Sequence, residues 1–242
     1  MTNEEIKAKA EAFGKWYHGL ELFPGFITDH QPFEDIWDQI RAARAGIDYQ
    51  GKSVLDLGTM DGMWALDAEK AGARLVVAGD IWANPRLDLV KRVFNSQMIT
   101  VPNADVHCLH ERLKVLMQLR GISGFDVVQC MGVIYHLQNP MLALNQIRHC
   151  ISDDGLMLLE TGCWTGGGDE PVARLNRGQM IYADGSTYWM MNFPCLEIVL
   201  GLCGFKVEPG SVKRFWQHGA SERVCCICRP TATYPSPDNY GV

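Results

Sequence analysis

The stretch "VLDLGTMDGMWALDAEKAGARLVVAGDI", residues 54–81, contains two short apolar runs that each end in an aspartate. A turn with two glycines and a helical pattern separate these runs. This order predicts two parallel strands that are joined by a crossover helix. Ligands of such sheets bind at the carboxyl ends of the strands, which is where Asp56 and Asp80 stand.

The same rhythm continues along the chain and predicts an α/β fold. We expect a Rossmann-like sheet of seven mostly parallel strands, with helices on both faces and one closing strand antiparallel to the rest. The expected strands are 53–57, 75–80, 98–101, 125–131, 155–160, 205–215 and 223–229. The expected helices are 3–14, 34–45, 62–71, 86–95, 108–120, 140–151 and 194–203.

We expect a single domain, because a chain of 242 residues can bury one large core. Its expected parts are an N-terminal helical cap (1–50), a core (51–161), an insertion (162–193), a C-terminal helix with closing strands (194–230) and a tail (231–242). The insertion is rich in aromatic residues. Long irregular segments in compact domains are more often functional than idle.

Composition narrows the class of protein. The net charge of −6 gives no electrostatic reason to expect nucleic acid. The first residues, "MTNEEIKAKAEAFGKW", lack the apolar core of a signal peptide, and no apolar run is long enough to span a membrane. We therefore expect a cytoplasmic protein whose nine cysteines are reduced thiols. The tract "VCCIC" predicts buried strand cysteines, and we expect no metal site.

The glycine-containing turn distinguishes between two ligands. A dinucleotide site would have the pattern G-x-G-x-x-G, whereas here the pattern is D-x-G-x-x-D-G. Gly58 and Gly62 allow the backbone to approach a ligand closely, and Asp80 can accept both hydroxyls of a ribose. Asp56 and Asp61 would repel a pyrophosphate. The pattern therefore favours a ligand with a ribose and a positively charged end.

At these residues the sequence resembles the class I S-adenosylmethionine-dependent methyltransferases, over about residues 53–161. "LDLGTMDG" is similar to the glycine-rich first motif, "GDI" carries the ribose-binding acid, and "NADV" stands where the family places an acid near the adenine amine. "FDVVQCMGVIYHLQNP" and "DDGLMLLET" resemble the fourth and fifth strands. The family often has glycine at the position of Met60. The resemblance implies S-adenosyl-L-methionine as cofactor. The implied cofactor residues are Asp56, Gly58, Thr59, Asp61, Gly62, Asp80, Ile81, Asp105, Val106, Met131 and Tyr135.

A narrower resemblance is to the tRNA wobble-uridine methyltransferases that form methoxy and carboxymethoxy groups. It is carried by "CMGVIYHLQNPMLAL", "LLET" and "FPCLEIVLGLCGF". In those enzymes, residues that match Met131 and Tyr135 contact the cofactor. The branch that uses a carboxylated cofactor has a lysine where this chain has Ile36. This difference favours the ordinary methyl donor.

Methyl transfer requires an aligned acceptor and, for some acceptors, a general base. His136 is the leading candidate base, because it follows the fourth expected core strand, and His18 is the second. Aromatic residues on both sides of the core could form a lid that excludes water. Glu160 could bind a cationic substrate and Arg223 an acidic one. The candidate substrate residues are Trp16, Tyr17, Glu160, Tyr182, Tyr188, Trp189 and Arg223.

The sequence thus predicts an enzyme that transfers a methyl group from S-adenosylmethionine to an oxygen or nitrogen of a small-molecule acceptor. The alternative is a tRNA wobble-uridine methyltransferase, which the scattered basic residues disfavour. A nicotinamide-dependent oxidoreductase lacks support, because the second glycine of a G-x-G is missing. A non-catalytic nucleotide-binding module is disfavoured by the aromatic and histidine residues around the expected pocket.

Overall fold

The computed structural model describes residues 1–231 and divides the chain into two compact units. Within the described residues, unit 1 comprises Met1–Glu34 and Asp48–Ala104, and unit 2 comprises Asp35–Ile47 and residues 105–231. The expected tail at 231–242 lies outside the described residues, except for Thr231.

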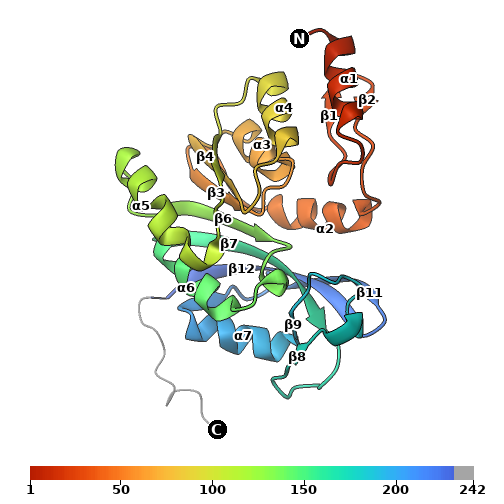
Figure 1. Ribbon diagram of the computed structural model, residues 1–242. Helices are drawn as coiled ribbons and strands as arrows, with labels where there is room; N and C mark the ends of the chain where they lie inside the picture. Colours follow the sequence, from red (N-terminus) through yellow and green to blue (C-terminus); the bar gives the residue numbers. More distant parts are fainter. Residues whose placement is uncertain (232–242) are drawn as a thin grey trace. The chain divides into compact units, whose positions relative to one another are not determined.

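Unit 1 is built on three parallel strands in the order β3, β4, β5 (Figure 1). Its core elements are β3 (Ser53–Leu57), α3 (Met63–Lys70), β4 (Leu75–Asp80), α4 (Pro85–Phe94) and β5 (Ile99–Pro102). Every residue of β3 is buried, as expected for a strand covered on both faces. Helix α4 begins where Asn84 accepts a hydrogen bond from the Arg86 amide, and Pro85 takes the first helical position.

The N-terminal residues of unit 1 pack beside this core. They form α1 (Asn3–Ala12) and a short hairpin of β1 (Glu21–Phe23) and β2 (Phe26–Ile27). Helix α1 starts with a capping box between Thr2 and Glu5 and packs against α4. The sequence predicts this helix but gives a loop for the hairpin, whose strands are too short to show alternation.

Unit 2 contains a mixed sheet in the order β6, β7, β12, β10, with β11 paired to β12. Strands β6 and β7 are parallel, whereas β12 runs antiparallel to β7. Its first half comprises α2 (Glu34–Arg44), η1 (Val106–Cys108), α5 (Leu109–Leu119), β6 (Phe125–Met131), η2 (Ile134–His136), α6 (Pro140–Cys150) and β7 (Ile151–Trp164). Its second half comprises β8 (Ala173–Leu175), η3 (Arg177–Gln179), β9 (Trp189–Met191), α7 (Phe193–Leu202), β10 (Phe205–Val207), β11 (Lys213–His218) and β12 (Ser221–Pro230).

The α/β class and the antiparallel closing strand are confirmed, and several element boundaries differ from those expected, most of all at β7 and at the segment 205–215. Strand β7 spans Ile151–Trp164 rather than 155–160, and its start was missed because the polar residues 152–154 carry no apolar signal. The segment 205–215 is two strands rather than one. Pro209 has no amide hydrogen to donate and Gly210 has a φ of 77°, so the chain turns between them. Counted over residues 1–231 and without the short pairs β1–β2 and β8–β9, unit 1 contributes three strands and unit 2 five, which makes eight in place of the seven expected.

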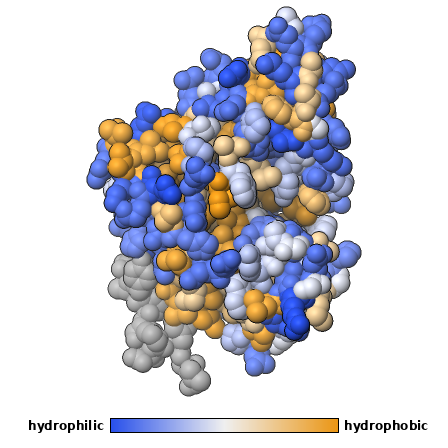
Figure 2. All heavy atoms as spheres, in the orientation of Figure 1, coloured by the Kyte–Doolittle hydropathy of each residue, from blue (hydrophilic) through white to orange (hydrophobic). Residues whose placement is uncertain are grey.

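The face of the molecule in Figure 2 is largely hydrophilic, with several apolar areas. Figure 2 shows apolar side chains gathered over α5, where Val115 is 56% and Leu119 79% exposed. Cys226 and Cys228 are buried on one face of β12 with their sulfur atoms 3.7 Å apart, in the alternation that the sequence predicts. Within residues 1–231, no helix has the length and apolar character that crossing a bilayer requires.

Candidate functional site

The loop after β3 in unit 1 has an unusual backbone. Gly58, Met60 and Gly62 have φ angles of 67°, 52° and 86°, in the left-handed region that favours glycine. A Cβ atom on Gly62 would lie 2.4 Å from Cδ1 of Leu87. Met60, which stands where the resembled family often has glycine, therefore adopts the conformation that a glycine would favour. Such strain persists where surrounding contacts impose it, and it is concentrated at binding sites.

Asp80 imposes part of this conformation. Its Oδ2 accepts a hydrogen bond from the Met60 amide at 2.9 Å, and its Oδ1 accepts one from the Trp82 amide at 3.1 Å. The side chain of Asn84 holds the same loop by donating to the Met60 carbonyl at 2.7 Å. Asp80 is only 7% exposed, whereas Ile81 is 51% exposed. A carboxylate oxygen accepts more than one hydrogen bond, so Asp80 can hold this loop and also bind hydroxyl groups.

Two further carboxylates of unit 1 are buried next to this loop, Asp56 near the end of β3 and Asp61 in the loop itself. Asp56 Oδ2 accepts a hydrogen bond from the Thr59 hydroxyl at 2.7 Å, which fixes the start of the loop. Asp61 is fully buried and binds His18 twice, through the His18 amide at 2.8 Å and its Nδ1 at 2.5 Å. Asp61 therefore holds the N-terminal segment against the loop. Together with Asp80, these carboxylates give the loop a negative potential that suits a cationic ligand.

The N-terminal candidates of unit 1 are more buried than a substrate site requires. His18 is 2% exposed, and its ring contacts Tyr17 and Trp64 edge to face. Trp16 is 1% exposed, and its indole nitrogen donates to the Ala10 carbonyl. These contacts favour a structural role for Trp16 and His18, and their assignment to substrate and catalysis stays a prediction.

In unit 2, the candidate cofactor residues begin at η1 and at the end of β6. Asp105 caps η1, since its Oδ1 accepts hydrogen bonds from the His107 amide and from His107 Nδ1, both at 2.9 Å. The hydrogen bond from the His107 backbone lowers the pKa of Asp105, so this acid is ionised at neutral pH. Val106 and Met131 are buried, at 7% and 9% exposed.

A buried ion pair joins the two charged residues predicted to bind substrate. Arg223 Nε and Nη2 donate to the two carboxylate oxygens of Glu160, each at 2.6 Å. The side chains are 4% and 1% exposed. Burial lowers the pKa of Arg223, whereas the interaction with Glu160 raises it. The net pKa lies well above the usual value, so the guanidinium stays charged. Each charge neutralises the other, which favours a structural role for the pair over recognition of charged substrates.

Two tyrosines complete this cluster. Arg223 Nη1 donates to the hydroxyls of Tyr135 at 2.9 Å and Tyr182 at 2.8 Å. The guanidinium carbon also lies 4.8 Å from the centre of the Tyr135 ring and 5.8 Å from that of Tyr182. Tyr182 comes from the predicted insertion and Tyr135 from η2. The cluster therefore attaches the insertion to the end of the sheet in unit 2.

His136 lies beside this cluster and is partly exposed. Its Nδ1 is 2.9 Å from the hydroxyl of Ser186, and its Nε2 is 4.0 Å from Oδ2 of Asp184. Burial lowers the pKa of His136 from its usual value, so the ring is neutral at neutral pH. A neutral, accessible imidazole can accept a proton, which is the chemistry required of a general base.

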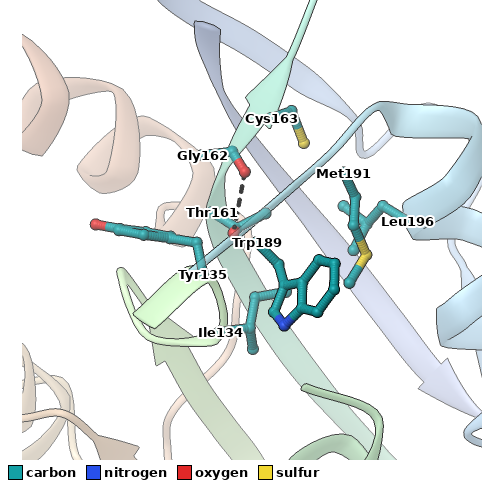
Figure 3. Close-up of a pocket in the computed structure, with 8 residues that line it drawn as sticks. All are labelled: Ile134, Tyr135, Thr161, Gly162, Cys163, Trp189, Met191 and Leu196. Carbon is teal, nitrogen blue, oxygen red and sulfur yellow. Dashed lines mark hydrogen bonds between the residues drawn. The ribbon is translucent and has the colours of Figure 1, made fainter. Parts of the chain in front are cut away.

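The remaining aromatic candidates pack around the same turn. The Trp189 indole nitrogen donates to the Gln138 carbonyl at 3.0 Å, and the Tyr188 hydroxyl accepts from the Gln138 side chain at 3.1 Å. Figure 3 shows a small cavity in unit 2, in which the Trp189 indole lies near Met191 while the Tyr135 ring extends away from it. The cavity volume is about 10 Å³, room for about one water molecule, so it cannot hold an acceptor.

Sequence reasoning missed Ser186, Asp184 and Asn84. The run "ADGS" carries the Asp-Gly signal of a turn, but a turn signal gives no indication of the partner. Asn84 before Pro85 does carry a readable signal for a helix start, although its bond to the loop after β3 is a tertiary contact.

Comparison with known proteins identifies the family. Residues 29–198 match a family described as "Methyltransferase domain". A protein of Syntrophotalea carbinolica named tRNA U34 carboxymethyltransferase is 29% identical over 207 residues, which are 85% of this chain and 60% of that protein. This chain therefore spans less than two thirds of the length of that relative.

Solved structures match the fold over most of the chain. The N-terminal domain of EvdMO1, with S-adenosylhomocysteine bound, has a TM-score of 0.69 at 18% identity and covers 96% of this chain and 98% of its own. The 1,6-didemethyltoxoflavin-N1-methyltransferase of Burkholderia thailandensis has a TM-score of 0.58 at 20% identity, covering 82% of each chain. These likenesses confirm the Rossmann-like fold. With the family match over residues 29–198, they show that this chain belongs to the methyltransferase domain family.

Proposed function

We propose that this chain transfers a methyl group from S-adenosylmethionine to an oxygen or nitrogen of a small-molecule acceptor. The observation that carries the proposal is the loop after β3, whose left-handed backbone is held by Asp80 beside two buried carboxylates. This arrangement suits a ribose and a positive charge together, and S-adenosylmethionine has both.

The residues of unit 1 fit this cofactor. Asp80 would accept hydrogen bonds from the ribose hydroxyls, and Gly58, which has no side chain, would allow the cofactor to approach the backbone closely. The carboxylate of Asp56 adds to the negative potential of the loop. When bound, the cofactor supplies an electrophilic methyl group on a positively charged sulfur. Solved relatives of the same fold contain S-adenosylhomocysteine, its demethylated product, which supports the proposal.

Ile36 supports the ordinary methyl donor over a carboxylated one. The branch of wobble-uridine enzymes that uses a carboxylated cofactor has a lysine at this position, whereas Ile36 is apolar and 8% exposed in α2. An isoleucine cannot bind a carboxylate. We therefore expect S-adenosylmethionine rather than its carboxylated form.

The second candidate function is modification of the tRNA wobble uridine. It is favoured by the names of the curated relatives, which are tRNA U34 carboxymethyltransferases at 26–31% identity. This chain covers 40–60% of their length. Its net charge of −6 does not favour a phosphate-rich partner. We therefore place the small-molecule acceptor first.

Two binding measurements test the proposal. Calorimetry should show S-adenosylhomocysteine binding more tightly than NADH, and the reverse order would refute the cofactor. Filter binding with bulk tRNA at about 50 and 150 mM salt separates the two acceptors, because each phosphate contact steepens the fall of affinity with salt. Micromolar affinity for tRNA with a steep salt dependence would show that tRNA, rather than a small molecule, is the acceptor. Weak tRNA binding with little salt dependence would support the small-molecule acceptor.

A further inference from the structure

Three side chains of unit 2 form a short hydrogen-bonded chain next to the ion pair. The hydroxyl oxygen of Ser186 lies 2.6 Å from Oδ1 of Asp184 and 2.9 Å from Nδ1 of His136. The Ser186 amide also donates to Asp184 Oδ1, at 2.8 Å. His136 belongs to η2 and the other two residues to the insertion, so the chain links two separate segments.

The donors and acceptors in this chain can be assigned. Burial raises the pKa of Asp184, whereas the hydrogen bonds from Ser186 lower it. The net pKa is below the usual value, so the carboxylate is ionised. An ionised carboxylate only accepts hydrogen bonds, so the single hydroxyl proton of Ser186 points to Asp184. Ser186 must then accept from His136, which places the ring proton on Nδ1. The unprotonated nitrogen of the neutral ring is therefore Nε2.

The second oxygen of Asp184 lies on the Nε2 side of the same ring. Its distance from Nε2 is 4.0 Å, and the side chains of His136 and Asp184 are 31% and 38% exposed. At this separation the carboxylate would stabilise an imidazolium by charge while leaving Nε2 accessible. Nδ1 of the ring is thus hydrogen-bonded to Ser186, and Nε2 faces the negative charge of Asp184.

The segment that carries Asp184 and Ser186 is well held. Asn176 is 7% exposed, accepts from the amides of Ile181 and Tyr182, and donates to the Asp184 carbonyl at 3.3 Å. The Tyr188 amide donates to the Tyr135 carbonyl at 2.9 Å, directly before His136. Positioned contacts of this kind fix the orientation of a catalytic side chain.

We propose that Ser186 and Asp184 are positioning residues that present Nε2 of His136 as the general base for the acceptor. This proposal rests on the proposed methyl transfer. In the step concerned, the acceptor forms a bond to the methyl carbon as the bond from that carbon to sulfur breaks, and the acceptor proton passes to Nε2. Nδ1 keeps its own proton, which stays hydrogen-bonded to the Ser186 hydroxyl. The resulting imidazolium carries one positive charge opposite Asp184, and it later returns the proton to water. Because His136 touches the acceptor in this scheme, it is the catalytic residue.

The charged groups around His136 set its pH dependence. Burial and Arg223 lower the pKa of the ring, while Asp184, Ser186 and Glu160 raise it, and the net effect is a lowered pKa. The Tyr135 ring packs against the imidazole at 4.1 Å between ring centres. The rate should therefore be highest above the pKa of His136 and fall as the pH drops through it.

Nitrogen-15 NMR of the histidine rings tests the proposal without cofactor or acceptor. The signals of His136 are identified by their loss in His136→Asn. We expect a protonated Nδ1 and an unprotonated Nε2 in the wild type at neutral pH. In Ser186→Ala, part of the population should shift to the Nε2-protonated form. In Asp184→Asn, the pKa of His136 should fall below that of the wild type, because a nearby negative charge is removed.

A matched control keeps the test specific. Asp153 is an aspartate of the same unit whose carboxylate is 92% exposed and pairs with Arg148, so Asp153→Asn should leave the His136 signals unchanged. A protonated Nε2 in the wild type would overturn the proposal, and so would an unchanged tautomer in Ser186→Ala. A cofactor that fails to bind would refute the proposed function, whereas the NMR result would be unaffected.

Discussion

Replacement of Asp80 by alanine tests the cofactor site directly. In the structure, each oxygen of Asp80 already accepts one backbone amide, from Met60 at 2.9 Å and from Trp82 at 3.1 Å. The carboxylate is 7% exposed, so a ligand that reaches it does so at a largely desolvated site. Hydrogen bonds to such a group are stronger than those to an exposed one.

The expected loss follows from these contacts. A hydrogen bond to a charged group contributes about 1.5–3 kcal/mol. Loss of the ribose contacts of Asp80 should therefore raise the Kd for S-adenosylhomocysteine by about 10- to 150-fold. Asp80→Ala also frees the amide of Met60, whose φ of 52° is strained, so the loop itself should relax. Asp80→Asn keeps one carbonyl oxygen and should give an intermediate loss.

Isothermal titration calorimetry of the folded variants measures this effect. Asp88→Ala is the matched control, because Asp88 is an exposed aspartate of α4 in the same unit and its removal changes the net charge equally. Circular dichroism establishes that each variant is folded before titration. An unchanged Kd in Asp80→Ala would refute the reasoning, and so would an equal loss in Asp88→Ala.

Two further predictions concern stability, measured by urea unfolding. Glu160→Gln should lower the free energy of unfolding by about 3–5 kcal/mol, because it leaves the charge of Arg223 buried without its partner. The double variant with Arg223→Met should lose less free energy of unfolding than the two single variants lose together. Strictly additive losses would contradict the pairing. Gly62→Ala should cost about 1–3 kcal/mol, because Gly62 has a φ of 86° and the added Cβ would lie 2.4 Å from Cδ1 of Leu87. The control is Gly46→Ala, which meets no atom within 4 Å and should change stability by less than about 0.5 kcal/mol.

The local part of the site could be predicted from the sequence. Asp56 and Asp80 were placed at strand ends, where the structure has β3 and β4, because apolar runs and glycine turns are patterns of neighbouring residues. The loop with Gly58 and Gly62 was predicted for the same reason, and both residues have positive φ angles. These features require no knowledge of distant contacts.

The pairings between distant residues could not be predicted. Glu160 and Arg223 were assigned to separate substrate roles, yet they bind each other across 63 residues of sequence. Asp61 was assigned to the cofactor, yet both its oxygens are used by His18. In each case the sequence gives the charge of a residue correctly, but the partner depends on how the strands and the N-terminal segment pack.

The same limit applies to the candidate base. A histidine that follows a core strand can serve as a general base, but whether it does so depends on which ring nitrogen carries the proton. That choice depends on Ser186 and Asp184, which lie about 50 residues further along the chain. Neither residue has a sequence pattern that connects it to His136, so only the folded unit reveals the arrangement.

The state of His136 also bears on the choice between oxygen and nitrogen as the methyl acceptor. A neutral amine attacks through its free lone pair and needs no base before the attack, whereas a hydroxyl becomes a good nucleophile only as its proton leaves. A ring that is neutral, has its Nδ1 bonded to Ser186 and faces Asp184 is of use mainly to a hydroxyl acceptor. We therefore expect a methoxy product, recognisable by the carbon-13 shift of a methyl group transferred from labelled S-adenosylmethionine. An N-methyl product that His136→Asn forms as fast as the wild type would show that the enzyme acts by positioning alone.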